Sequence, residues 1–389
     1  MTGKLVRSAA GLAAVLLPLT ACSAGGQDSA RPGPSATADH PVFGQKTGRQ
    51  VFLALRETQK AGTARFTQKL TFTGKEGDLV RTMTGSLDFA ADRGSVAVAW
   101  DLPAKTSAKV RTAVLGSTPS REDGEASGTY LIDRDRTRYR AASSPYWIDY
   151  APEDTEGVAK SFVGEDPLEF LRGSEAPVGG TLLEAVGAGT ATAYREGKAG
   201  GRVYRAGLPD TTLELLFPPD LGPHLVTAGA SAAQRPPVPL AVEVDAQGRL
   251  TRAGITVKDA FREDGDLTAF TTLTMDLTLT GYGSPVPSPA PGDRVLKAAD
   301  VVRDIAGVRK GGCVDFTTGQ RNSRQVVTVS CGGSHDARIT GQHRVAPGAD
   351  PEETTARSQA VCGRGIWAWW TPPEEGTGTE VLTTCYEVS

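Results

Sequence analysis

The cysteines are the residues of this 389-residue chain with the clearest chemistry, and their positions divide them into two groups. Cys22 stands alone near the start, directly after an apolar run. The other four lie in the last fifth of the chain: Cys313, Cys331, Cys362 and Cys385. A thiol can be acylated, paired in a disulfide or bound to zinc, so its chemistry depends on the compartment that the chain enters.

The first 21 residues predict an export signal. Lys4 and Arg7 supply positive charge, and the apolar run of residues 12–19 is too short to cross a bilayer. Such a leader is removed and adds nothing to the fold. Because an exported chain enters an oxidising compartment, the leader favours disulfides for the four later cysteines.

The sequence Leu19-Thr20-Ala21-Cys22 resembles the bacterial lipobox. The resemblance implies that residues 1–21 are a lipoprotein signal peptide and that Cys22 is an N-terminal lipid anchor, with acyl chains such as palmitate. It places the protein on the extracytoplasmic face of the cell membrane. Two acyl chains would anchor it persistently, whereas one would hold it only marginally. The alternative is an ordinary secreted protein that is cleaved near Ala21.

Composition excludes several classes of function. The net charge is −3, and loss of Lys4 and Arg7 with the leader would bring it to about −5. The chain has no basic tract, which argues against a nucleic-acid partner. It also has no glycine-rich phosphate loop, paired-histidine metal helix or redox Cys-x-x-Cys motif, so we predict a non-enzyme without a cofactor.

The chain after Cys22 begins with a segment that has little to bury. Residues 22–47 are rich in Ser, Ala, Gly and Pro, and we expect a disordered tether. Residues 48–61 have apolar side chains on one side of a helical wheel, which predicts an amphipathic helix that ends at Gly62.

Alternating segments follow, and their period of two predicts antiparallel strands. One face of these strands is dominated by threonine, which indicates that it meets water. The other face is apolar, and the apolar residues that we single out on it are Phe66, Leu70, Phe72, Leu87, Phe89, Trp100, Leu273, Met275 and Leu277.

Residues 48–282 resemble the LolA-like lipoproteins, of the LppX and LprG type. The resemblance rests on the order of lipobox, tether, helix and threonine-rich strands, and on short matches at Trp147-Ile148, Asp166-Pro167-Leu168 and Val244-Asp245-Ala246-Gln247-Gly248. It implies an α+β fold, a curved antiparallel half-barrel with covering helices that holds a lipid or other hydrophobic ligand. The nine apolar residues above would then bind that ligand. The alternative is that they form a dry core.

A proline-rich linker, residues 283–293, predicts a domain boundary. Residues 294–389 resemble a septum-formation-type domain in Gly312-Cys313-Val314, His335-Asp336-Ala337-Arg338 and the later cysteines. The chain departs from that family at Gly312, where Asp is usual, and at Arg338, where Glu is usual. The resemblance implies a small disulfide-bonded α+β domain and no particular mechanism.

Four cysteines allow three pairings. We expect Cys313–Cys331 and Cys362–Cys385, which would each stabilise the fold by about 3 kcal/mol in the chain-entropy model. A zinc site of Cys313, Cys331 and His335 is disfavoured by the even cysteine count. Ser334, His335 and Asp336 contain the residue types of a catalytic triad, but neighbours on a turn point apart, so we expect His335 and Asp336 to fix that turn by local hydrogen bonds.

The last elements predicted are a helix that begins at Asp350 and runs to about Trp367, and a terminal strand containing Cys385. Trp367, Trp369 and Trp370 are expected in the core, and an exposed partner- or glycan-binding patch is the alternative. The sequence therefore predicts a non-catalytic, membrane-anchored envelope lipoprotein that binds a hydrophobic ligand. The alternative function is an interaction or signalling module, related to the cell wall or division, without a ligand cavity.

Overall fold

The computed structural model describes residues 39–75, 77–91, 93–107, 110–111, 127–133, 136–150, 182–208, 225, 237–263, 265, 267–286, 294–316, 325–371 and 380–389. Residues from Asp39 to Ser389 belong to one compact unit. The signal peptide, Cys22, the first part of the predicted tether and Asp166-Pro167-Leu168 lie outside the described residues. The last part of the predicted tether is folded, which corrects the prediction: Val42 and Phe43 are buried in the apolar core.

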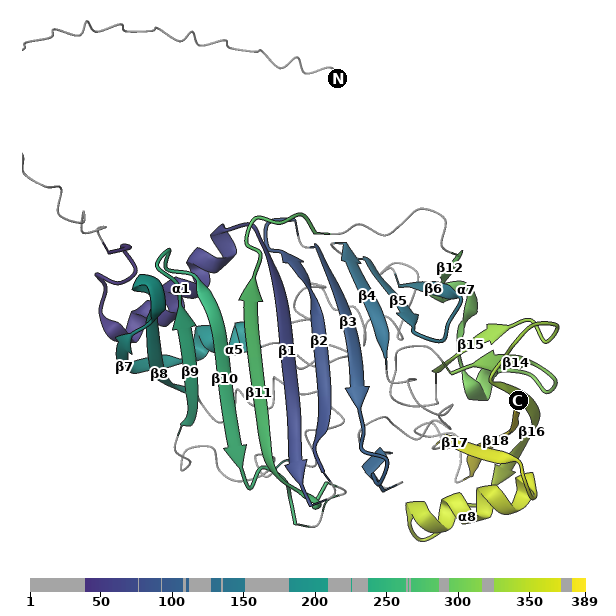
Figure 1. The fold of residues 1–389 in the computed structure, drawn as a ribbon. Coiled ribbons are helices and arrows are strands. Elements are labelled where there is room, and N and C mark those ends of the chain that lie inside the picture. The colour runs from purple at the N-terminus through teal and green to yellow at the C-terminus, as the bar shows by residue number, and fades with distance from the viewer. Residues whose placement is uncertain are drawn as a thin grey trace, which may run out of the picture. The chain divides into compact units, whose positions relative to one another are not determined.

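A twelve-stranded sheet forms the larger part of this unit (Figure 1). Its strands are β1 (Thr63–Gly74), β2 (Leu79–Asp88), β3 (Arg93–Asp101), β4 (Gly128–Asp133), β5 (Arg136–Ala141), β6 (Tyr146–Tyr150), β7 (Thr190–Glu196), β8 (Arg202–Leu208), β9 (Val238–Val244), β10 (Leu250–Lys258), β11 (Phe270–Thr280) and β12 (Arg294–Lys297). Their spatial order is β12-β6-β5-β4-β3-β2-β1-β11-β10-β9-β8-β7. Two meanders are thus joined where β1 pairs with β11.

The sheet is mixed, which corrects the wholly antiparallel sheet that the sequence predicts. β12 follows the predicted linker and pairs in parallel with β6, from Arg294 opposite Tyr146 to Lys297 opposite Asp149. Without β12, β6 would expose unpaired backbone N–H and C=O groups at the edge of the sheet. The pairing covers that edge.

The alternation of side chains confirms the prediction of one buried and one water-facing side. In β1, Phe66 and Leu70 are buried, while Arg65 and Lys69, which directly precede them, are exposed. On the opposite strand, every second residue from Leu273 to Leu279 is buried and threonines dominate the other face. This pattern follows from the pleat of a strand, in which successive side chains point to opposite faces.

Two helices pack on the buried face, and the first of them corresponds to the helix predicted at residues 48–61. α1 (Thr47–Lys60) contacts β7, β9 and β10, and α5 (Leu182–Ala188) contacts α1, β8, β10 and β11. Thr58 ties the last turn of α1 to the sheet, because its hydroxyl accepts a hydrogen bond from the Leu250 N–H at 2.8 Å. None of the helices in the described ranges has the length and apolar character needed to span a bilayer.

A six-stranded sheet follows in the order β13-β15-β14-β16-β18-β17. Its strands are β13 (Val302–Asp304), β14 (Cys313–Asp315), β15 (Gln325–Val329), β16 (Ala337–Val345), β17 (Trp367–Thr371) and β18 (Val381–Val388). The short helices α7 (Ala298–Val301) and η5 (Ile305–Gly307) lead into it, and α8 (Pro351–Cys362) packs on β16, β17 and β18.

The end of α8 corrects the prediction of a helix to Trp367. Asp350 caps the start as expected, since its carboxylate accepts a hydrogen bond from the Glu353 N–H at 2.8 Å. The helix ends at Cys362 because Gly363 and Gly365 adopt φ values of 92° and 78°, which side chains other than glycine rarely tolerate. Trp367 therefore begins a strand.

The two sheets share contacts. Ala298, Val302 and Val327 belong to the same apolar core as the larger sheet. The Tyr146 hydroxyl donates to Asp315 Oδ2 at 2.5 Å and so links β6 to β14. The domain boundary at 283–293 stays a prediction.

Candidate hydrophobic-ligand site

The nine apolar residues singled out from the sequence meet on one face of the larger sheet. Seven of them are fully buried in a single cluster: Phe66, Leu70, Phe72, Leu87, Leu273, Met275 and Leu277. Phe89, just after β2, and Trp100 on β3 are partly buried and pack against that cluster. The buried face of the sheet, which we call the inner face, thus contains the whole set.

The pairing register arranges these side chains in rows across the strands. Leu70 lies opposite Met275, and Phe72 lies opposite Leu273. Another row runs from Leu277 through Gln68 and Met83 to Val98. Side chains directly opposite each other on neighbouring strands are in contact range, so the rows form one continuous apolar surface from β11 to β3.

Two glycines leave room for aromatic rings on this surface. A Cβ atom at Gly85 would lie 2.9 Å from the Phe66 ring, and one at Gly128 would lie 2.5 Å from the Tyr139 ring. The rings of Tyr130 and Tyr139 continue the surface to β5, with their centroids 4.7 Å apart. Aromatic rings therefore cover the glycines, and the apolar surface has no break at these positions.

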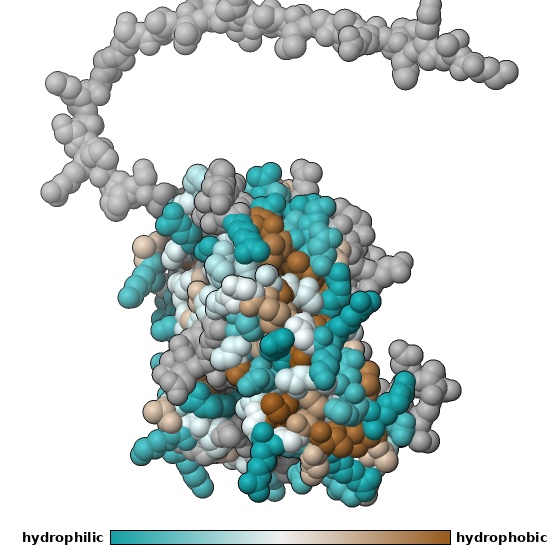
Figure 2. Space-filling model, turned by 90° about the vertical axis from the view of Figure 1, so that its right-hand side faces the viewer, coloured by the Kyte–Doolittle hydropathy of each residue, from teal (hydrophilic) through white to brown (hydrophobic). Residues whose placement is uncertain are grey.

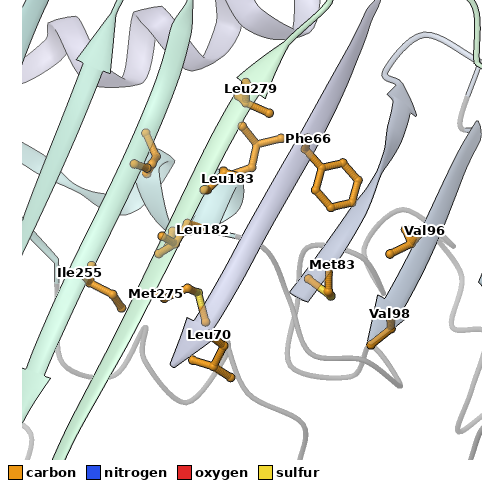
Figure 3. Packing of buried hydrophobic residues seen from close by; sticks show 14 of the residues in the cluster. Phe66, Leu70, Met83, Val96, Val98, Leu182, Leu183, Ile255, Met275 and Leu279 are labelled. Carbon is orange, nitrogen blue, oxygen red and sulfur yellow. The ribbon is translucent and has the colours of Figure 1, made fainter. Parts of the chain in front are cut away.

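The described helices lie toward one end of the inner face. α1 and α5 pack on strands β7 to β11. In Figure 3, Leu182 and Leu183 of α5 lie beside Met275 and Leu279, whereas Met83, Val96 and Val98 extend over β2 and β3. The apolar surface consequently continues beyond the strands on which these two helices pack.

Two polar residues lie on the inner face that the sequence analysis did not single out. Gln68 accepts a hydrogen bond from the Leu182 N–H at 2.8 Å, which satisfies one of the unpaired N–H groups at the start of α5. Arg81 is only 1% exposed, and its guanidinium lies 5.7 Å from the centroid of the Trp100 ring. Gln68 and Arg81 stand at the same alternating positions as the apolar residues of β1 and β2. This alternation alone could have placed them on the inner face.

Buried tyrosines should make the stability of the larger sheet depend on pH in the alkaline range. Burial raises the pKa of Tyr204 and of Tyr282 to about 12. Burial also raises the pKa values of Tyr139 and Tyr150 far above the usual value. The folded state therefore favours the neutral phenol at all four positions.

We expect the free energy of unfolding to fall above about pH 10, the unfolded pKa of tyrosine. The stabilisation is complete below that pH and is lost as the pH rises through the folded pKa, with a slope of up to roughly 1.4 kcal/mol per pH unit for each tyrosine. Denaturant unfolding at several alkaline pH values measures this slope. Tyr150→Phe should reduce it, and a slope unchanged from the wild type in this variant would contradict the assignment.

The cysteines of the smaller sheet form two disulfides, Cys313–Cys331 and Cys362–Cys385. This is the pairing expected from the sequence, and it excludes Cys313 and Cys331 as free zinc ligands. The described residues contain no group of three or more His, Cys, Asp or Glu side chains that could hold a metal ion.

The Ser334-His335-Asp336 segment forms the local hydrogen bonds that the sequence predicts. The His335 Nδ1 lies 2.9 Å from the Gly333 carbonyl oxygen. Asp336 Oδ2 accepts from the Phe316 N–H at 3.0 Å, and the Asp336 N–H donates to Asp315 Oδ1 at 3.1 Å. The segment thus fixes the turn between β15 and β16.

The three tryptophans near residue 370 have different surroundings. Trp369 packs on the apolar core of the smaller sheet, and Trp370 Nε1 donates to Thr355 of α8 at 3.1 Å. Trp367 is 48% exposed on β17, the last strand in the order of that sheet. Figure 2, which views the right-hand side of Figure 1, shows hydrophobic side chains exposed between hydrophilic ones. Core packing therefore describes Trp369, whereas Trp370 is half-buried against α8 and Trp367 is exposed.

Comparison with known proteins yields only distant structural similarity. No protein-family model matches the chain, and no curated protein matches it. Among solved structures, the lipoprotein LppX of Mycobacterium tuberculosis aligns at 12% identity and a TM-score of 0.30, over 61% of this chain and 98% of LppX. A putative outer membrane lipoprotein-sorting domain of Vibrio parahaemolyticus aligns at 10% identity and a TM-score of 0.19, over 59% of this chain and 92% of that domain.

The Pseudomonas aeruginosa MucA/MucB complex aligns over 87% of this chain and 94% of the matched chain, at 8% identity and a TM-score of 0.24. Similarities this weak assign neither a fold nor a function.

Proposed function

We propose that the chain is a non-catalytic envelope lipoprotein that holds a lipid or another hydrophobic ligand against the inner face of its larger sheet. Cys22 would carry the acyl chains that anchor it to the membrane. In this proposal the sheet and its helices act as the half-barrel of the LolA-like lipoproteins.

One observation carries the proposal: the apolar inner face extends from β11 to β5, beyond β1 and the strands β7 to β11 that α1 and α5 contact. A sheet must bury its apolar face against another layer. Side chains beyond the helices, such as Met83 and Val98, are already buried within the protein, so an acyl chain would replace part of that packing; it suits this surface because it buries apolar area without needing hydrogen-bond partners. Gln68 and Arg81 would be polar side chains within this otherwise apolar surface.

Binding of a fluorescent acyl-chain probe tests the proposal. The protein is first extracted with organic solvent and refolded, and the probe is then titrated. We expect saturable binding at one site with a rise in fluorescence, and competition by unlabelled fatty acid. Binding that does not saturate would sink the idea of a defined site.

The anchor has its own test. Cys22→Ala should move the protein from the membrane fraction to the soluble fraction or medium, since no acyl chain can be attached. The four later cysteines should stay paired, because both disulfides form within residues 313–385, far along the chain from Cys22. Fractionation and a non-reduced peptide map measure the two effects. Membrane retention of Cys22→Ala at the wild-type level would contradict acylation at this residue.

A second candidate function is an interaction module, and the exposure of Trp367 on an edge strand favours it. Edge strands and exposed aromatic residues are common in protein interfaces. Trp367→Ala should then abolish partner capture while probe binding is unchanged. Loss of probe binding in this variant would argue against two independent surfaces.

A further inference from the structure

The solvent-exposed side of α1 is positively charged along its length. We define its basic face by the exposed residues Lys46, Arg49, Phe52, Arg56 and Lys60. Phe52 is 43% exposed in the middle of the cations. Spacings of three and four residues place these side chains on one side of the helix, and the side that packs on the fold contains Val51, Ala54 and Leu55.

Positive charge is electrostatically unfavourable at the start of a helix. The helix macrodipole favours acidic residues in the first turn, but that turn contains none, and Lys46 stands at the N-cap without a capping side chain. The whole chain is acidic, with a net charge of −3, so the cations are a local concentration. Helix stability therefore does not account for Lys46 and Arg49 at the start of α1, whereas the macrodipole favours Lys60 in the last turn.

Two of the cations have their charge available to a partner. Within the described ranges, the side chains of Arg49 and Arg56 make no hydrogen bond or ion pair. Lys60 is paired with Glu57 at 2.6 Å. The basic face consequently retains a net positive charge.

The helix is fixed to the sheet by a buried network at its first turns. Gln50 accepts a hydrogen bond from the Tyr204 hydroxyl at 2.7 Å and donates one to the Phe43 carbonyl at 3.1 Å. Arg202 donates to the same carbonyl at 3.1 Å, and its guanidinium lies 4.6 Å from the Phe43 ring centroid. The basic face thus has a fixed orientation relative to the larger sheet.

We infer that the basic face docks on an anionic phospholipid surface. Arginine and lysine are attracted to anionic headgroups, and an aromatic side chain among them can enter the interface. Asp39, the first described residue, follows Cys22 by 17 positions, and a chain of that length spans at most roughly 60 Å, which lets α1 reach the bilayer that holds the anchor. Tethering raises the effective concentration of the contact, so a weak attraction orients the domain.

Vesicle flotation tests this inference without the anchor. The protein is the unacylated chain from Cys22 onward, which contains the whole compact unit. Vesicles contain either equal parts of phosphatidylglycerol and phosphatidylcholine, or phosphatidylcholine alone. We expect binding only to the anionic vesicles, weakened by salt. Arg49→Gln/Arg56→Gln should lower the partition coefficient roughly 25-fold, at about fivefold for each cation.

A matched control removes two cations from the outer face of β1. Arg65→Gln/Lys69→Gln makes the same charge change at exposed sites and should bind as wild type. Phe52→Ala should bind more weakly but keep its salt dependence. Circular dichroism checks that α1 persists, since glutamine is a good helix former. Equal losses in the two double variants, equal binding to both vesicles, or no binding to either would overturn the inference.

Discussion

Replacing Val98 by tryptophan should abolish binding of an apolar ligand to the larger sheet. Val98 is buried on the inner face of β3, in the row that contains Met83 and Leu277. An indole at this position would occupy the space that we assign to an acyl chain. Loss of contact with two methylenes alone costs about 1.6 kcal/mol, so we expect affinity for the fluorescent probe to fall at least about tenfold.

The adjacent residue gives the matched control. Ala97 lies on the same strand, points to the opposite face and is exposed. Ala97→Trp adds the same ring to water and should bind the probe as wild type. Equal probe affinities for Val98→Trp and Ala97→Trp would contradict the assignment of the inner face.

Stability has to be measured beside affinity, because overpacking a core typically costs about 1–3 kcal/mol. If Val98→Trp fails to fold, Val96→Met makes a smaller increase in volume on the same face of β3. If the inner face is a dry core, the wild type should bind no probe, and Val98→Trp should only lose stability. A ligand site predicts that probe affinity falls in the folded variant.

Removal of the Cys362–Cys385 disulfide should lower the free energy of unfolding by about 3 kcal/mol, because the bond closes a loop with a sequence separation of 23. Cys362→Ser/Cys385→Ala tests this, since alanine avoids an unpaired hydroxyl at the buried position. The variant should unfold at lower denaturant with the Cys313–Cys331 bond intact.

Other contacts determine how much of α8 stays folded when the Cys362–Cys385 disulfide is removed. The Thr383 hydroxyl donates to Ser358 at 2.9 Å in the buried contact between α8 and β18, and Trp370 bonds to Thr355. We therefore expect the helix to remain folded but to exchange its amide protons faster. A loss of stability below about 1 kcal/mol would show that these contacts, and not the disulfide, hold α8.

Local patterns predicted much of the fold. The period of two in β1 and β11 identified the buried face, and the apolar positions of residues 48–61 predicted α1 almost to its ends. The spacing of the cysteines led to the pairing that the structure contains. These features depend on neighbours in sequence or on short loops.

The features that were missed depend on long-range contacts. The parallel pairing of β12 with β6 joins segments about 150 residues apart, and no local residue pattern indicates it. The same holds for the network of Gln50 with Arg202 and Tyr204. By contrast, Gly363 and Gly365 were a readable signal that α8 ends before Trp367.

The mass of the protein purified from its native host tests the central claim most directly. Acyl chains on Cys22, as proposed, would remain attached in a denaturing spectrum, whereas a ligand on the inner face would appear only in the native spectrum. We predict a native mass excess of about one hydrophobic molecule per chain, which is extracted by organic solvent and absent from Val98→Trp. Equal native and denatured masses in the wild type would contradict a ligand on the inner face.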